Sequence, residues 1–164
     1  MARLRRYCPP GIPQHVIQRG NNRTACFASD ADMAVYAHCL HEAASKFGLM
    51  IHGWVFMTNH IHLLVTPEAD DSLSKGMQFL GLSYVRYFNR TYQRTGTLFE
   101  GRFKSCLVEH SEYFLVCLRY IELNPVRAGM VKDPAHYHWS SYRANAFGKN
   151  LDTTPTLHGP GIHQ

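Results

Sequence analysis

The sequence lacks the features that mark exported, membrane-bound or disulfide-stabilised proteins. Its apolar runs are short, as in the five residues from Phe114, so no segment predicts a transmembrane helix. Prolines follow the basic start where a signal peptide would be apolar, so we expect a cytoplasmic protein with no membrane partner. The five cysteines are odd in number and include no C-x-x-C pair, which argues against a disulfide framework and a zinc ribbon.

Acidic residues are scarce relative to basic ones. The sequence has 17 Lys and Arg against 12 Asp and Glu, which gives a formal net charge of +5. This balance favours a polyanionic partner such as nucleic acid, although charge alone does not separate such a partner from a merely basic surface. With 164 residues, of which 45% are hydrophobic, the chain fits a single globular domain.

The order of the predicted elements indicates an α+β fold with an antiparallel sheet. Strands are predicted at residues 15–19, 49–57, 60–66 and 103–108, and helices at residues 29–47, 72–94 and 111–124. Pro125 should end the last helix, and the chain after Asp133 shows no periodicity. We expect residues 1–146 to form the domain and residues 147–164 to form a loosely ordered tail.

Two histidines in one predicted strand are the first candidate site. Strict alternation from His60 to Val65 places His60 and His62 on the same face of the strand. Two neutral imidazoles in this arrangement can bind one metal ion. The spacing fits equally well two strand histidines that form hydrogen bonds at the sheet surface.

Tyr120 and Asn124 form the second candidate site. They are four residues apart on the last predicted helix, so one lies above the other. Both fall outside the stripe of Phe114, Leu118 and Ile121 that should face the core. A tyrosine in this position can have a free hydroxyl, but a single tyrosine more commonly packs at the core edge and bonds a neighbour.

Phosphoryl transfer would use both candidates. The reaction needs a nucleophile in line with phosphorus and positive charge near the non-bridging oxygens. A divalent ion on His60 and His62, with the Asn124 amide as an optional third ligand, would supply that charge. Mg²⁺ or Mn²⁺ suits this role better than a closed structural zinc. Tyr120 also needs a proton acceptor, which the sequence does not identify.

The basic residues are grouped as well as numerous. Arg86, Arg90 and Arg94 repeat every four residues on the long helix, a like-charge ladder that favours an anionic partner. Tyr87 and Tyr92 lie between them as rings on which unpaired bases could stack. Further basic residues flank the fourth strand and the tyrosine: Arg102, Lys104, Arg119 and Arg127. For any one of these side chains, a solvated basic face is the competing explanation.

Taken in order, these segments resemble the single-tyrosine HUH transposases (IS200-like transposase domain), most closely the REP-associated tyrosine transposases. The matching segments are QRGNNR at 18–23, VFMTNHIHLL at 55–64, GRFKS at 101–105, YIELNPVRA at 120–128 and WSSYR at 139–143. A series of ordered motifs is far more specific than one H-x-H pair.

The resemblance implies a ferredoxin-like antiparallel sheet with helices packed on one face and the nucleophile on the C-terminal helix. It implies His60 and His62 as metal ligands, Asn124 in the place of a third, amide-type ligand, and Tyr120 as the nucleophile. The implied reaction cleaves single-stranded DNA at a hairpin or palindrome, using Mg²⁺ or Mn²⁺, to give a 5′-phosphotyrosine and a 3′-hydroxyl, followed by strand transfer.

The implied partner is single-stranded or hairpin DNA, bound by a monomer or a homodimer. On charge and position, the side chains expected to contact DNA are Arg19, Arg23, Arg86, Arg90, Arg102, Lys104 and Arg127.

Two other functions stay open. A domesticated, non-catalytic protein would bind single-stranded or hairpin DNA regardless of Tyr120→Phe and of chelators. A metal-dependent hydrolase would use water and form no covalent protein–DNA species. The intact set of His60, His62 and Tyr120 argues against a pure binding protein, which needs none of this chemistry.

Overall fold

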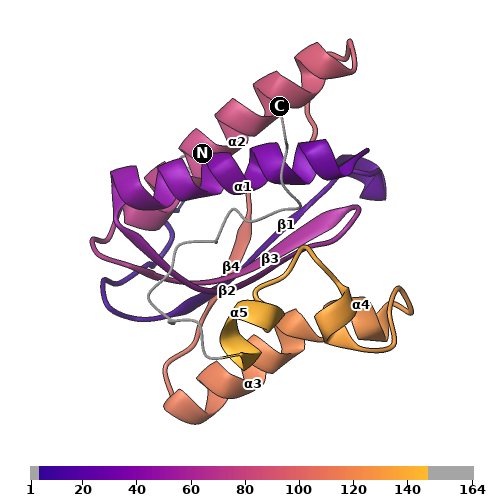
Figure 1. The fold of residues 1–164 in the computed structure, drawn as a ribbon. Coiled ribbons are helices and arrows are strands. Elements are labelled where there is room, and N and C mark those ends of the chain that lie inside the picture. The colour runs from indigo at the N-terminus through magenta and orange to yellow at the C-terminus, as the bar shows by residue number, and fades with distance from the viewer. Residues whose placement is uncertain (1–3, 148–164) are drawn as a thin grey trace.

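Residues 4–147, which the computed structural model describes, form a four-stranded sheet with helices on both faces (Figure 1). The strands are β1 (Gln14–Arg19), β2 (Leu49–Phe56), β3 (His60–Pro67) and β4 (Lys104–Leu107). The helices are α1 (Asp30–Phe47), α2 (Ser72–Thr91), α3 (Ser111–Glu122), α4 (Asn124–Arg127) and α5 (Tyr142–Ala146), with short 3-10 helices at Asn21–Arg23 and Pro134–His136. The predicted α+β class is confirmed; residues 148–164 of the expected tail lie outside the described residues.

The order and register of the strands determine which residues lie on the same face of the sheet. The strands run β2-β3-β1-β4, and every neighbouring pair is antiparallel. In the β1–β3 pair, Ile17 lies opposite His62 and Arg19 lies opposite His60. Directly opposed residues share a face of the sheet. The alternate residues His15, Ile17 and Arg19 therefore lie on the same face as the two β3 histidines.

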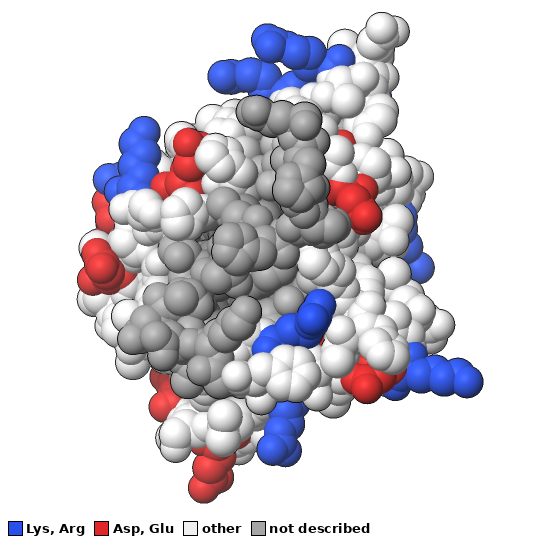
Figure 2. All heavy atoms as spheres, viewed as in Figure 1, with Lys and Arg blue, Asp and Glu red and all other residues white. Residues whose placement is uncertain are grey.

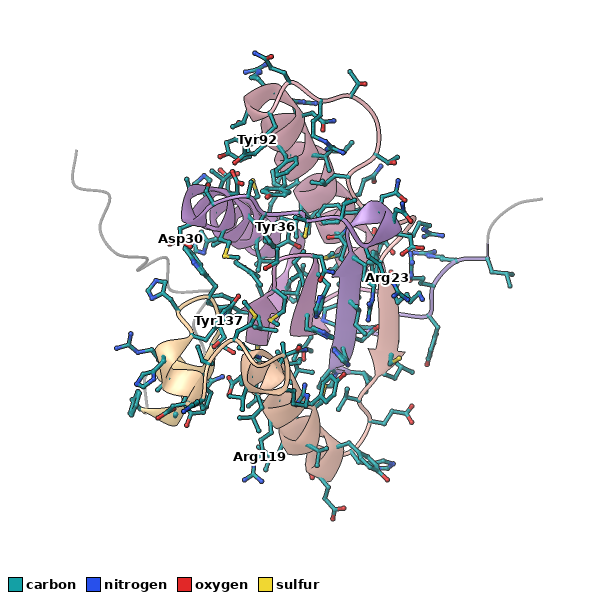
Figure 3. All side chains as sticks on the ribbon, turned by 90° about the vertical axis from the view of Figure 1, so that its right-hand side faces the viewer. Arg23, Asp30, Tyr36, Tyr92, Arg119 and Tyr137 are labelled. Carbon is teal, nitrogen blue, oxygen red and sulfur yellow. The ribbon has the colours of Figure 1, made fainter. Side chains whose placement is uncertain are left out.

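Helices cover both faces of the sheet, which corrects the expectation that they pack on one. Helices α1 and α2 lie together on one side and α3 lies on the other (Figures 1 and 3). The reason is visible in β3, where Leu63 on one face and Leu64 on the other are both at most 1% exposed. A strand that is apolar on both faces needs a covering layer on each.

A glycine lets α3 approach the sheet closely. A Cβ atom on Gly53 of β2 would lie 2.3 Å from Cδ1 of Leu118, a distance that real Cβ atoms do not show. Leu118 and its neighbour on the same stripe, Ile121, are 8% and 0% exposed. The absent side chain on β2 thus makes room for the apolar stripe of α3.

A buried carboxylate joins α1 to α2. Asp32 completes a capping box with Ser29 at the start of α1, and its oxygens also accept the hydroxyls of Tyr87 at 2.9 Å and Tyr92 at 2.6 Å. Tyr92 is labelled in Figure 3. These two rings fasten α2 to α1. Their hydroxyls are therefore engaged, whereas the Tyr92 side chain is still 37% exposed, and base stacking on these rings stays a prediction.

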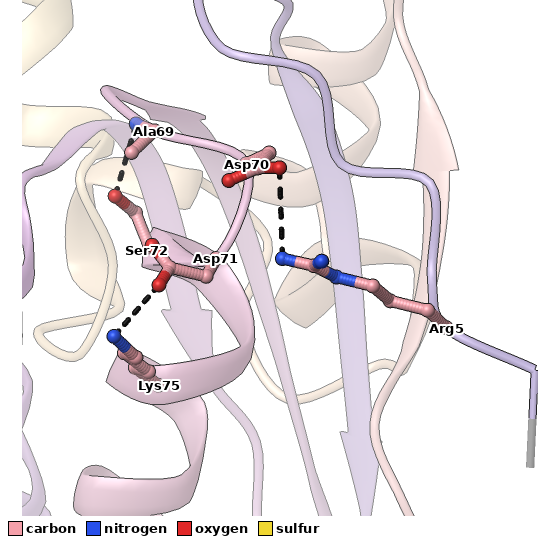
Figure 4. Close-up of polar contacts among 6 residues, drawn as sticks. All are labelled: Arg5, Ala69, Asp70, Asp71, Ser72 and Lys75. Atoms are coloured by element: carbon pink, nitrogen blue, oxygen red, sulfur yellow. Dashed lines mark hydrogen bonds and ion pairs between the residues drawn. The ribbon is translucent and has the colours of Figure 1, made fainter.

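The start of α2 is held by local contacts (Figure 4). Ser72 Oγ accepts the backbone N–H of Ala69 at 3.0 Å, and Lys75 lies 2.7 Å from Asp71. Arg5 of the N-terminal segment reaches Asp70 at 3.5 Å. Because both ion pairs are exposed to solvent, each contributes little to stability. Within residues 4–147 no helix is both long enough and apolar enough to cross a membrane.

The last predicted helix is interrupted, so its predicted end at residue 124 is wrong. Helix α3 ends at Glu122, Leu123 has φ −90° and ψ 0°, and the short α4 begins at Asn124. Pro125 is the cause, because it has no N–H to donate and its ring collides with the carbonyl four residues earlier.

The chain after Asp133 is also more ordered than predicted. Phe56 N–H donates to the Trp139 carbonyl at 2.9 Å, and Ser140 forms a bridge with Val55, so this segment covers the open edge of β2. The Tyr137 hydroxyl donates to the Phe56 carbonyl, and the Trp139 indole donates to Asp30 at 3.0 Å. Figure 3 labels Tyr137 and Asp30 on this side of the molecule. A five-residue helix such as α5 is too short for periodicity to predict.

Glu122 connects α3 to this C-terminal segment. Its Oε1 accepts the Ser141 hydroxyl at 2.7 Å and the Asn145 amide at 2.5 Å. Burial raises the pKa of the Glu122 carboxyl above its ordinary value of 4.5, and the two hydrogen bonds oppose the rise only in part.

We expect Glu122→Gln to flatten the pH dependence of stability. The folded state holds the Glu122 proton more tightly than the unfolded state does. The stabilisation of the folded state by protonated Glu122 is therefore full below pH 4.5 and is lost as the pH rises through the raised pKa. Glutamine keeps an oxygen for Ser141 and Asn145. Urea unfolding of both proteins at a series of pH values measures the difference, and parallel pH profiles would contradict the assignment.

Candidate active site

Side chains from three separate segments meet on the α3 face of the sheet. The ring centroids of His60 and His62 on β3 are 5.1 Å apart. The Tyr120 ring of α3 lies 5.9 Å from the His62 ring and 6.0 Å from the His15 ring of β1. The two constellations that the sequence showed separately therefore lie side by side.

Tyr120 lies at the edge of α3 and keeps its hydroxyl accessible. The side chain is 48% exposed, although Ile121 beside it is fully buried. Within residues 4–147 its hydroxyl makes no hydrogen bond. Among the described residues Tyr120 thus differs from the common core-edge tyrosine, whose hydroxyl bonds a neighbour.

Two arginines bring positive charge to this place. The Arg127 guanidinium lies 4.0 Å from the centre of the Tyr120 ring and donates to the Tyr120 carbonyl. Arg19 lies opposite His60 in the sheet. None of the three ion pairs within residues 4–147 includes Arg19 or Arg127. Their charge therefore remains available to an anion.

Both β3 histidines are neutral at physiological pH. Burial, followed by the influence of His15, His60, Arg19 and Arg127, lowers the pKa of His62 to about 3. Burial and then Arg19 lower the pKa of His60, and a hydrogen bond that His60 donates to the Asn124 amide opposes this by raising it. A neutral imidazole has a lone pair that a metal ion can use.

Asn124, the first residue of α4, lies beside His60. Asn124 is 9% exposed and hydrogen-bonded to His60, although it no longer continues the helix that carries Tyr120. Two neutral imidazoles and an amide oxygen are a donor set that suits a divalent cation. Within residues 4–147 no three or more His, Cys, Asp or Glu side chains are grouped to hold a metal ion.

His15 belongs to this cluster, and sequence reasoning missed it. Its Nε2 lies 2.9 Å from Nδ1 of His62. Burial lowers the pKa of His15, so this histidine is neutral as well. Alternation along β1 could have put His15 and Arg19 on one face, but nothing local to the sequence says that this face meets β3.

Two cavities flank the sheet. One of about 600 Å³ lies beside the tyrosine and is lined by His15, Cys106, Tyr113, Cys117 and Tyr120, among others. The larger, of about 840 Å³, lies between α2 and residues 96–103 and includes Arg86 and Arg102 in its lining. Helices α2 and α3 are on opposite sides of the sheet, so the larger cavity is remote from Tyr120 (Figure 1).

The basic residues predicted to contact DNA separate into two groups. Arg19 and Arg127 lie at the tyrosine, and Lys104 lies opposite Ile17 on the same face of the sheet. Arg86, Arg90 and Arg102 belong to the α2 side, which shows that the α2 ladder is not near the tyrosine.

Two further arginines remain, and the carbonyl of one, Arg23, accepts the amide of Asn59 beside His60. Arg23 ends the 3-10 helix that follows β1, and Arg119 points outward from α3 (Figure 3). Figure 2 shows basic side chains over one end of α2 and mixed charge elsewhere on the visible face.

Solved structures share this fold. The structure described as a REP-associated tyrosine transposase bound to a REP hairpin superimposes with a TM-score of 0.76 at 20% identity, over 97% of this chain and 94% of that chain. A Deinococcus radiodurans protein described as a transposase gives a TM-score of 0.50 at 19% identity, over 74% of this chain and 96% of its own.

One structure with a different chemistry is also similar. The tRNA(His) guanylyltransferase of Saccharomyces cerevisiae gives a TM-score of 0.50 at 9% identity, over 74% of this chain and 62% of that chain. Because such different proteins share the fold, the fold by itself does not decide the reaction.

Sequence comparison identifies the family. No curated protein sequence matches the chain. The family model described as "Transposase IS200 like" matches residues 10–124, a segment that includes His15, His60, His62, Tyr120 and Asn124. The chain therefore belongs to the IS200-like transposase family.

Proposed function

We propose that this protein is a metal-dependent single-stranded DNA endonuclease and strand transferase that forms a 5′-phosphotyrosine at hairpin or palindromic DNA. The observation that carries the proposal is the position of Tyr120. Its hydroxyl has no hydrogen-bond partner within residues 4–147, and its ring lies 5.9 Å from the His62 ring and 4.0 Å from the Arg127 guanidinium.

The reaction exchanges one phosphodiester for another. The Tyr120 oxygen loses its proton and forms a bond to phosphorus, while the bond from phosphorus to the 3′ oxygen breaks and that oxygen takes up a proton. The products are a 5′-phosphotyrosine and a free 3′-hydroxyl. Because the phosphodiester is preserved on the protein, a 3′-hydroxyl can attack it to rejoin or transfer the strand without nucleotide energy.

The protein's own groups would bind and orient the scissile phosphate. Arg127 and Arg19 offer guanidinium groups that take part in none of the ion pairs within residues 4–147, and guanidinium groups bind phosphate oxygens in a bidentate manner. His60, His62 and Asn124 are the residues that would hold Mg²⁺ or Mn²⁺, which when bound supplies positive charge to the non-bridging oxygens.

Two observations support a DNA strand as the substrate. The cavity of about 600 Å³ beside Tyr120 lies within the range of small-ligand pockets and has room for a nucleotide. The solved structure with a TM-score of 0.76 is described as bound to a REP hairpin. That match is at 20% identity, so it favours hairpin DNA here without specifying its sequence.

The decisive experiment is incubation of the protein with labelled single-stranded hairpin DNA and Mn²⁺, followed by a denaturing gel, beside an EDTA control. We expect cleavage and a covalent protein–DNA adduct, both abolished by EDTA. Cleavage without an adduct would favour water attack instead, and binding without cleavage of any supplied hairpin would favour the domesticated binding protein.

The α2 ladder gives a separate prediction. We expect Arg90→Ala to weaken hairpin binding for every sequence tested and to reduce the slope of log K against log salt by about 1, as for one lost phosphate contact. Arg119→Ala removes the same charge from the outer side of α3 and serves as the matched control. Fluorescence anisotropy over a salt series measures the affinity and the slope for each variant. Equal slopes for Arg90→Ala and wild type would refute a phosphate contact by Arg90.

A further inference from the structure

We propose that His15 is a positioning residue that holds His62 in the tautomer whose Nε2 carries the lone pair for a metal ion. The inference rests on the proposed function, because a tautomer of His62 matters to the reaction only if His62 binds metal. It extends the site from the H-x-H pair to a third histidine on a different strand.

The contact between the two rings is a hydrogen bond within the sheet. His15 lies opposite Leu64, one position along the same face from the Ile17–His62 pair, so His15 and His62 are diagonal neighbours. His15 Nε2 and His62 Nδ1 are 2.9 Å apart. The ring centroids are 5.1 Å apart and the planes differ by only 26°. A nitrogen separation so much shorter than the centroid separation means that the rings meet edge to edge.

Only one of the two possible proton arrangements is compatible with a metal on His62. Two neutral imidazoles form this bond with one nitrogen as donor and the other as acceptor. If His15 Nε2–H donates, His62 must carry its own proton on Nε2, which then has no lone pair. If His62 Nδ1–H donates to His15, Nε2 of His62 is free to bind metal. Metal binding therefore requires His15 to act as the acceptor.

The other histidine of the pair has the same arrangement with a different partner. His60 Nδ1 lies 2.7 Å from Oδ1 of Asn59, and Nδ2 of Asn59 donates to the Arg23 carbonyl at 3.3 Å. Because the amide nitrogen is used by Arg23, the oxygen faces His60 and must accept a proton from Nδ1. Both β3 rings are thus held at Nδ1 by an outer partner.

Outer partners of this kind matter to metal sites. A carbonyl, carboxylate or other acceptor on the second nitrogen of a ligating histidine orients the ring and selects its tautomer. Loss of such a partner typically weakens metal binding roughly 10- to 100-fold. The His15 ring also makes an edge contact with the Tyr120 ring, with centroids 6.0 Å apart.

The test reads the tautomer and the metal affinity separately, on the full chain. Long-range nitrogen–proton NMR of the metal-free wild type should show His62 protonated on Nδ1 and His15 unprotonated on Nε2. Calorimetry should show Mn²⁺ binding about 10- to 100-fold weaker in His15→Leu, which has no acceptor. His15→Gln, whose side-chain oxygen can accept the same proton, should restore binding close to wild type.

His52→Leu is the matched control. His52 lies on β2, is hydrogen-bonded to Thr66 and packs against Phe114 of α3, so the change removes a comparable half-buried histidine from the same face without touching His62. We expect Mn²⁺ binding by this variant to equal that of wild type.

The outcomes separate the inference from the proposed function. If wild type fails to bind Mn²⁺, the proposed metal site is wrong and the inference falls with it. If wild type binds Mn²⁺ but His15→Leu binds equally well, or His62 proves to be protonated on Nε2, only the role of His15 is refuted. Because the tautomer is measured in wild type, poor folding of His15→Leu would not rescue the inference.

Discussion

Tyr120→Phe should abolish DNA cleavage and the covalent adduct while leaving hairpin binding nearly unchanged. The change removes one oxygen atom from a side chain that is 48% exposed and whose hydroxyl holds no neighbour within residues 4–147. The ring remains, so the contacts with His62 and the Arg127 guanidinium are kept. Loss of a nucleophile typically lowers the rate by on the order of 10⁴-fold or more.

The chain supplies a matched control on the same helix. Tyr113 is also on α3 and is 62% exposed, so Tyr113→Phe removes an equally accessible hydroxyl from the wall of the same cavity. Single-turnover cleavage on a denaturing gel and anisotropy binding should be measured for both variants. Cleavage by Tyr120→Phe at the wild-type rate would refute the nucleophile assignment, whereas equal loss in both variants would mean that the cavity rather than one hydroxyl had been damaged.

His62→Ala should lose Mn²⁺ binding and cleavage together. His62 is 3% exposed and its pKa is about 3, so at neutral pH it presents a neutral imidazole from a position that solvent hardly reaches. Removing a ligand should weaken Mn²⁺ binding by more than the roughly 10- to 100-fold expected for an outer partner. Calorimetric titration with Mn²⁺ and the gel assay measure the two losses.

Stability must be followed in the same variant, because alanine leaves a void between β3 and α3. His52→Ala, a change on the neighbouring strand beneath the same helix, shows how much of any loss comes from packing. If His62→Ala bound Mn²⁺ as tightly as wild type, the metal assignment would be wrong. If His62→Ala stayed folded but lost Mn²⁺ binding, while His52→Ala stayed folded and kept Mn²⁺ binding, the assignment of His62 as a ligand would stand.

Several elements could be predicted from the sequence because their signals are local. Strict alternation from His60 to Val65 predicts a strand, and β3 spans His60–Pro67. The helical spacing from Leu73 to Phe88 predicts the amphipathic α2, in which both residues are buried. The spacing of apolar residues indicates which face of a helix or strand is buried, although it does not identify the element that packs on that face.

Other features could not be predicted because they depend on partners distant in the sequence. The contact of Asn124 with His60 joins residues 64 positions apart, so it depends on how α3 and α4 pack against β3. The order of residues also does not say how far the like-charge ladder on α2 lies from the tyrosine, and the structure separates them because α2 and α3 cover opposite faces of the sheet (Figure 1). His15 carries no local signal that separates it from the other ten histidines.

The sequence by itself determined the strand that carries His60 and His62 on one face, and it determined the ordered motifs that indicate the family. Both are properties of residue order and spacing, which folding does not change. The tertiary structure alone decided that His15 meets His62 and that Tyr120 lies beside both. Those contacts depend on the register between β1 and β3 and on the packing of α3 against Gly53. A shift of one residue in that register would turn His15 to the opposite face of the sheet.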